Sequence, residues 1–187
     1  EPITYTLRSV NSGEGAARKT VVFDRLPRNA TFIDAVTPAY NQRIFFSNAD
    51  VPNLPVSVRA AGTWTEDFVL TSGLFTPGTV TGAVVTSPVA NPTWIAVLVD
   101  DSSLVPHQLP ASGAPREVSY RVRLPNGDAD LDSLVVNEAI IASSELNSAG
   151  SNLVQTLISD DPALEIDGAC QGTVASGENV DLVYSFN

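Results

Sequence analysis

Apolar and polar residues alternate along several short stretches of this chain, a pattern typical of half-buried β-strands. Every second residue from Ile3 to Leu7 is apolar, and the residues between them are polar. The segment 117–124 alternates in the same way. By contrast, Trp94–Val99 is apolar throughout, as expected of a strand that is buried on both faces.

Further short strands are expected where β-branched and aromatic residues lie between Gly, Pro and Asn turn signals. These strands are 20–24, 31–36, 43–47, 54–59, 64–70, 80–86, 134–143, 152–158, 172–175 and 180–186. The best helical segment is the short stretch Leu131–Leu134. Because strands and helices do not alternate, the pattern predicts an all-β sandwich or barrel rather than a parallel α/β fold.

The predicted organisation is a main sandwich that contains one long inserted stretch, followed by a C-terminal extension. Residues 1–146 form the main sandwich, and residues 147–187 form a C-terminal extension of linker and strands. The stretch 41–90 is longer than hairpins require, which indicates either an insertion or extra strands on one edge.

The chain is acidic, with 21 Asp and Glu against 10 Lys and Arg and a formal net charge of -11. This charge argues against nucleic acid and anionic lipid as partners, because both would repel it. It is typical of a solubilising coat on extracellular or salt-tolerant proteins. No stretch of about 18 apolar residues occurs, so we expect no membrane insertion.

Three blocks resemble a conserved repeat domain of unknown function that occurs in tandem on bacterial and archaeal surface proteins. They are Ile3–Ala35, with its N-S-G turn and V-V-F-D-R-L-P motif, the strand Arg116–Pro125 after the turn Ala111–Gly113, and Val135–Glu145. The resemblance implies an immunoglobulin-like antiparallel β-sandwich that serves as a stalk, spacer or polymer unit, and it does not imply catalysis.

The two ends of the chain are similar to each other. Glu1–Asn11 and Gly177–Asn187 are both alternating strand patterns that contain a Glu near the start and end in Asn. The first expectation is a sandwich that lacks its first strand, with an open edge that a neighbour's tail completes. The tail residues expected to form this intersubunit strand are Leu164, Ile166, Val174, Val180, Leu182, Tyr184 and Phe186. Two alternatives remain open: a tail that completes its own sandwich, and a boundary drawn through a repeat array.

Such a contact is heterologous and does not close, so it builds a head-to-tail homo-oligomeric fibre. Cys170 is the only cysteine, which excludes a disulfide within the chain and leaves an inert thiol or an intersubunit bond. A chain that starts at Glu1-Pro2 and contains no Met suits a secreted product after leader removal, or a cut piece.

One loop is a candidate metal site. Asp128, Asp130 and Asp132 occupy alternate positions in N-G-D-A-D-L-D, and hard cations such as Ca²⁺ take several carboxylate oxygens. The loop lacks a downstream Glu at the usual spacing, so a solvated acidic loop is the alternative. No other cofactor is expected.

The remaining candidates are single residues. An isopeptide bond would need Lys19, with Asn137 and Glu138 as conceivable partners, but the sequence lacks the known signatures of such bonds. His107 occurs without a nucleophile-elbow motif. Aromatic residues for sugar stacking are Trp64 and Tyr40, with Trp94 expected in the core, and Asn29 begins a glycosylation sequon.

The sequence therefore predicts a non-enzymatic, extracellular structural subunit that polymerises by β-strand complementation into a filament or surface layer. The alternative is a stalk or adhesion module of a larger surface protein that binds carbohydrate or protein.

Overall fold

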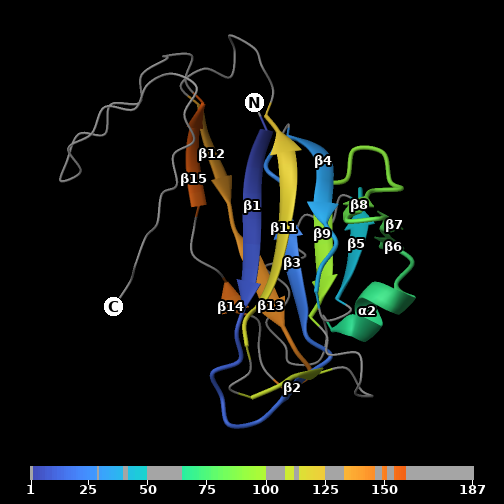
Figure 1. Cartoon of the computed structure of the whole chain (residues 1–187), viewed down its shortest axis with the longest axis vertical. Helices are drawn as coiled ribbons and strands as arrows, with labels where there is room; N and C mark the ends of the chain where they lie inside the picture. The colour runs from blue at the N-terminus through green and yellow to red at the C-terminus, as the bar shows by residue number, and fades with distance from the viewer. Residues whose placement is uncertain are drawn as a thin grey trace, which may run out of the picture.

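The computed structural model describes residues 2–28, 30–39, 42–49, 65–99, 108–111, 114–124, 133–145, 149–150 and 154–158. Two antiparallel sheets pack face to face in this part of the chain (Figure 1). The first sheet has the order β1 (Pro2–Ser9), β11 (Arg116–Arg123), β4 (Thr31–Val36), β8 (Val84–Thr86) and β7 (Thr79–Thr81). The second has the order β14 (Ala149–Gly150), β13 (Ala139–Ala142), β3 (Val21–Arg25), β9 (Trp94–Leu98), β5 (Arg43–Ser47) and β6 (Thr76–Pro77).

Two smaller ribbons complete the described strands. β2 (Ala17–Arg18) pairs with β10 (Gln108–Leu109), and β12 (Ser133–Asn137) pairs with β15 (Val154–Ile158). Every pairing is antiparallel, and only one short helix, α2 (Glu66–Thr71), occurs among the described residues. The predicted all-β class and the immunoglobulin-like antiparallel β-sandwich are thus confirmed.

Two apolar clusters hold the layers together. The first lies between the sheets and includes Tyr5, Tyr120 and Val122 from one sheet and Val22 and Val97 from the other. The second lies on the outer face of the second sheet, under α2. Its buried members are Val21, Phe23, Phe45, Val69, Phe75, Trp94, Ala96 and Leu98. Because β9 contributes to both clusters, its run W-I-A-V-L is buried along its whole length, as predicted.

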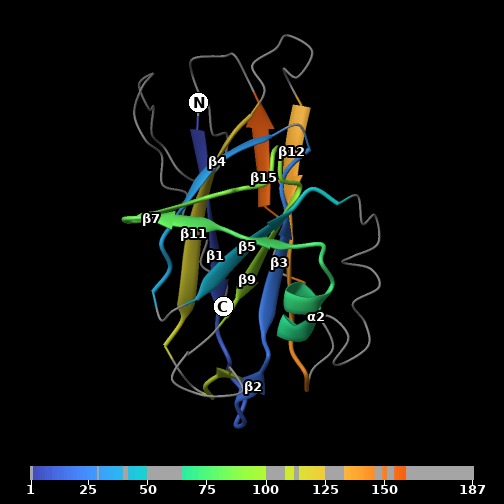
Figure 2. The same cartoon turned by 90° about the vertical axis from the view of Figure 1, so that its right-hand side faces the viewer.

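The described strands between residues 42 and 90 lie at one edge of both sheets, and the role of 41–90 as an insertion stays a prediction. β5 and β6 extend the second sheet beyond β9, and β8 and β7 extend the first sheet beyond β4. Figure 2 looks onto this edge, with β5 and β7 toward the viewer. The boundary at residue 146 remains a prediction, and the next described strands, β14 and β15, pair with β13 and β12.

Three local predictions were wrong. The stretch 64–70 was predicted as a strand, but residues 66–71 form α2, whose first turn contains the acidic side chains that a helix N-terminus favours. The stretch 80–86 is a hairpin rather than one strand, because Gly82 takes a left-handed φ of 62° at its turn. Of the predicted helical stretch 131–134, residues 133 and 134 begin β12.

Candidate functional site

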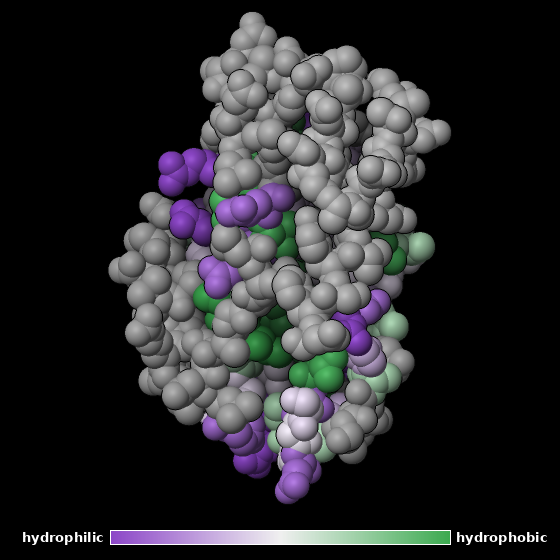
Figure 3. All heavy atoms as spheres, turned by 90° about the vertical axis from the view of Figure 1, so that its left-hand side faces the viewer, coloured by the Kyte–Doolittle hydropathy of each residue, from purple (hydrophilic) through white to green (hydrophobic). Residues whose placement is uncertain are grey.

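A groove runs along the open side of the sandwich, between the edge strand β1 and the strand β13 of the opposite sheet. Its volume is about 290 Å³, and it is lined by residues 5–10, 137–141, Val22 and Val154. Figure 3 views the molecule from this side and shows apolar surface gathered in a hollow. The inward face of β1 carries Ile3, Tyr5 and Leu7, as the sequence predicts, and Tyr5 and Leu7 line the groove together with the outward residues Thr6 and Arg8.

β1 is the outermost strand of its sheet in the described part of the chain. It pairs with β11 along its whole length, from Pro2 opposite Arg123 to Ser9 opposite Arg116, and no described strand pairs with its other edge. Backbone N–H and C=O groups on that edge are therefore available to a further strand. A groove beside such an edge would receive that strand's inward side chains.

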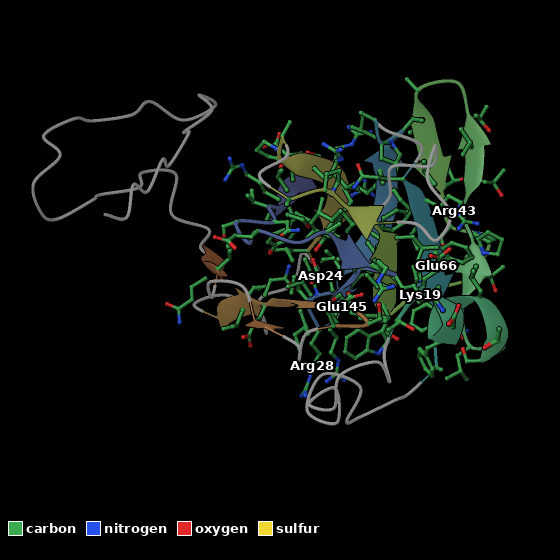
Figure 4. The ribbon with its side chains drawn as sticks, turned by 90° about the horizontal axis from the view of Figure 1, so that it is seen from below. Lys19, Asp24, Arg28, Arg43, Glu66 and Glu145 are labelled. Atoms are coloured by element: carbon green, nitrogen blue, oxygen red, sulfur yellow. The ribbon has the colours of Figure 1, made fainter. Side chains whose placement is uncertain are left out.

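A polar cluster is buried between the sheets, where Asn137 lines the groove. The Tyr120 hydroxyl donates to Oδ2 of Asp24 at 2.7 Å, and the Asn137 amide donates to the Tyr120 hydroxyl oxygen at 3.0 Å and to Oδ2 of Asp24 at 3.3 Å. Asp24 lies on β3, Tyr120 on β11 and Asn137 on β12, so the cluster joins both sheets and the β12–β15 ribbon. Figure 4 places Asp24 in the middle of the molecule.

Burial changes the protonation of this cluster. The Asp24 side chain is fully buried, and burial raises its pKa to about 7, although the hydrogen bonds from Tyr120 and Asn137 act to lower it. Burial, together with the nearby Asp24 carboxylate, also raises the pKa of Tyr120. Oδ1 of Asp24 and Oδ1 of Asn137 are buried without a hydrogen-bond partner in the described part of the chain. A neutral carboxylic acid on Asp24 is the form that this environment favours at acidic pH.

A second and larger cavity opens at one end of the sandwich, also beside Asn137. Its volume is about 680 Å³, and its polar lining includes Arg25, Arg28, Asn91 and Glu138. The Arg25 guanidinium lies 5.7 Å from the centre of the Trp94 ring, which holds it against the core. The cavity therefore combines charged and amide side chains with apolar lining residues such as Leu26 and Val136.

Lys19 and Asn137, which the sequence raised as conceivable isopeptide partners, have different partners in the structure. The Lys19 ammonium pairs with the Asp67 carboxylate at the start of α2, whereas Asn137 contacts Asp24 and Tyr120. Lys19 has a φ of 53°, at the turn between β2 and β3. Its role here is to anchor α2, together with the Arg43–Glu66 pair at 3.0 Å (Figure 4).

Most of the other predicted site residues lie outside the described residues. These are the acidic loop Asp128, Asp130 and Asp132, the tail residues Leu164, Ile166, Val174, Val180, Leu182, Tyr184 and Phe186, and Cys170, Trp64, Tyr40, His107 and Asn29. The calcium site, the intersubunit strand and the intersubunit thiol thus stay predictions. Among the residues described, no group of three His, Cys, Asp or Glu could hold a metal ion. Trp94 is buried in the core, as predicted.

Sequence reasoning did not identify the Asp24–Tyr120–Asn137 cluster. The signal that was available is Asp24 itself, a carboxylate that follows the apolar residues Val21–Phe23 within one strand. The partners could not be read from the pattern, because Asp24 and Tyr120 are 96 residues apart in the chain.

Comparisons with known proteins assign no family. No family model and no curated protein matches the chain. Among solved structures, domains D2 and D3 of the major pilin SpaD from Corynebacterium diphtheriae match with 13% identity and a TM-score of 0.37. The match covers 83% of this chain and 46% of the pilin fragment, so the chain spans about half of that fragment. At this level of similarity the match assigns no function. Within the described residues, the only helix is far too short to cross a membrane.

Proposed function

We propose that this chain is a non-enzymatic structural subunit whose copies assemble head-to-tail, outside the cell, into a filament or surface layer. In this assembly the C-terminal segment 163–187 of one copy adds as a strand to an open sheet edge of the next. The single observation that supports the proposal is β1, a long edge strand beside a groove with a partly apolar lining. Because the donating segment and the accepting edge are different surfaces, each added copy leaves a new free edge.

Several features of the chain agree with an assembly role. The strong net negative charge of -11 keeps subunits soluble before they assemble. The resemblance of three sequence blocks to tandem surface repeats also points to a stalk or polymer unit. In this proposal the cell-surface location comes from the sequence resemblance.

The end cavity supports a second candidate function, a stalk or adhesion module that binds carbohydrate or protein. Its polar lining of Arg25, Arg28, Asn91 and Glu138 offers donors and acceptors for hydroxyl or amide groups. This function needs no polymer, so the same experiment separates the two candidates.

Negative-stain electron microscopy of the full chain, beside a chain without residues 163–187, tests the proposal. Filaments that disappear on truncation are the expected result. Monodisperse monomers in both preparations would overturn polymerisation and favour the binding module. Filaments that survive truncation would show that another contact joins the subunits.

A further inference from the structure

The sheet edges in the described part of the chain differ strongly in how well they could accept a strand. β6 has only two residues, one of which is Pro77 and has no N–H to donate. β14 also has two residues, and β7 has three, all exposed. β1 has eight residues. The strands of the β12–β15 ribbon have five residues each, so β1 is the longest open edge in the described part of the chain.

β1 also lacks the devices by which proteins usually protect an edge strand. Its single proline, Pro2, is its first residue, and its register with β11 continues without a bulge. Its one charged residue, Arg8, lies on the solvent face, where it pairs with Glu117 at 3.3 Å. The edge is therefore regular, although Arg8 and Glu138 contribute charged side chains to the border of the groove.

The groove beside β1 has a mixed lining, and its apolar side chains come from both sheets. Leu7 contributes from β1, and Ile140 and Ile141 contribute from β13. Val10 and Val154 also line it and are 45% and 39% exposed. A strand added to β1 would cover these side chains with its own inward residues, which stabilises the complex by about 25 cal/mol for each Å² of apolar surface buried.

The segment Glu178–Asn187 has the pattern that this edge requires. The apolar residues Val180, Leu182, Tyr184 and Phe186 occupy every second position, and Asp181, Val183 and Ser185 lie on the other face. On a strand these four side chains would all point into the groove. Its ten residues are enough to cover the eight of β1.

Building on the proposed function, we propose that residues 178–187 of a second copy add antiparallel to the outer edge of β1, with Asp181 opposite Arg8. This register places Leu182 opposite Leu7, Tyr184 opposite Tyr5 and Phe186 opposite Ile3. Apolar side chains then meet on the groove face, and opposite charges meet on the solvent face.

Two observations favour this direction and register. All strand pairs of the first sheet are antiparallel, so an antiparallel strand continues the existing ladder. A parallel strand with the same inward residues would place Ser185 opposite Arg8 and leave Asp181 beside Thr4. Antiparallel registers shifted by two residues also separate Asp181 from Arg8.

Pairs of cysteines test the contact directly, in a background in which Cys170→Ser removes the native thiol. One preparation carries Thr4→Cys, on the exposed face of β1, and the other carries Ser185→Cys. The proposed register places these residues opposite each other, and cross-strand neighbours are within the roughly 4.4–6.8 Å between Cα atoms that a disulfide spans. Mixing and oxidation should give a covalent dimer on a non-reducing gel.

The matched control pairs Arg8→Cys with Ser185→Cys. Position 8 lies four residues from position 4, about 13 Å along a strand, so the control dimer should be lost. If Arg8→Cys forms the dimer and Thr4→Cys does not, the proposed register is wrong.

Microscopy of the same samples separates this inference from the proposed function. Filaments without either disulfide would overturn the proposed register on β1 but not polymerisation. Absence of filaments would overturn the proposed function itself. A chain with both Thr4→Cys and Ser185→Cys should form a ladder of covalent oligomers. A monomer closed on itself would instead show that the groove holds the chain's own tail, which overturns the role of a second copy.

Discussion

The two long sides of the sandwich are closed to different degrees. On the side of α2, the outer face of the second sheet is covered by Val69, Phe68 and Phe75, over a cluster that includes Trp94. On the side of β1, the described part of the chain ends in an unpaired edge and a groove. Figure 1 shows α2 on one side and the β12–β15 ribbon on the other.

The difference shows how one pair of sheets can combine stability with a binding edge. Strands on the closed side are apolar on both faces, so their burial supplies most of the stability. β1 alternates, and its inward face completes the core while its outer edge pairs with no described strand. The following predictions test this contrast, beginning with the largest effect.

Phe23→Ala should destabilise the protein by about 3–5 kcal/mol, because it leaves a cavity under α2. The Phe23 side chain is 1% exposed, and its ring lies 5.9 Å from that of Phe75, centre to centre. Urea unfolding followed by tryptophan fluorescence measures the change. The matched variant on the open side is Leu7→Ala, which removes a half-buried side chain. We expect it to lower the free energy of unfolding by about 1–2 kcal/mol. Equal losses in the two variants would mean that the two sides are closed alike.

Asp24→Asn should change how stability depends on pH. The pKa of Asp24 is about 7 in the folded protein against an ordinary value of 3.8, so the folded state binds this proton more tightly. Its contribution to stability is therefore fully present below about pH 4 and is lost as the pH rises to about 7. About three pKa units correspond to a loss on the order of 4 kcal/mol.

The substitution introduces a neutral amide, which does not titrate in this range. Between about pH 4 and 7 the free energy of unfolding of the variant should therefore stay nearly constant, whereas that of the wild type should fall. Other carboxylates act in the opposite direction at lower pH. Hydrogen bonds from Arg121 lower the pKa of Asp34, and the contacts of Glu145 with Arg18 and Ser144 outweigh burial and lower its pKa. Their contributions are lost as the pH falls below about 4. Parallel pH profiles of the two proteins would argue against an elevated Asp24 pKa.

The sequence predicted the strands better than it predicted the helix or the polar cluster. The stretches 31–36 and 43–47 were predicted to the residue, because β-branched and aromatic residues end there at turn signals. α2 has six residues, too few for a helical period to emerge, and it is held by Lys19 and Arg43 from distant parts of the chain. The Asp24 cluster likewise depends on which strands meet across the sandwich, and the local pattern does not encode that.

Gly78→Ala tests the closed side where the chain passes from β6 in the second sheet to β7 in the first. A Cβ at this position would lie 2.5 Å from Cγ1 of Val85 and 2.9 Å from Cε2 of Phe46, side chains that belong to opposite sheets. Both are buried, so they can yield little, and we expect a loss of about 1–3 kcal/mol in urea unfolding.

The matched control is Gly15→Ala, in the turn that follows β1. Nothing lies within 4 Å of a Cβ added there, so the change in stability should stay within about 0.5 kcal/mol. Close packing between the sheets at Gly78 predicts that the two alanines differ clearly. If Gly78→Ala lowers the free energy of unfolding no more than Gly15→Ala does, the packing between the sheets at Gly78 adjusts as easily as an exposed turn. The closed side would then not be more tightly packed than the open side.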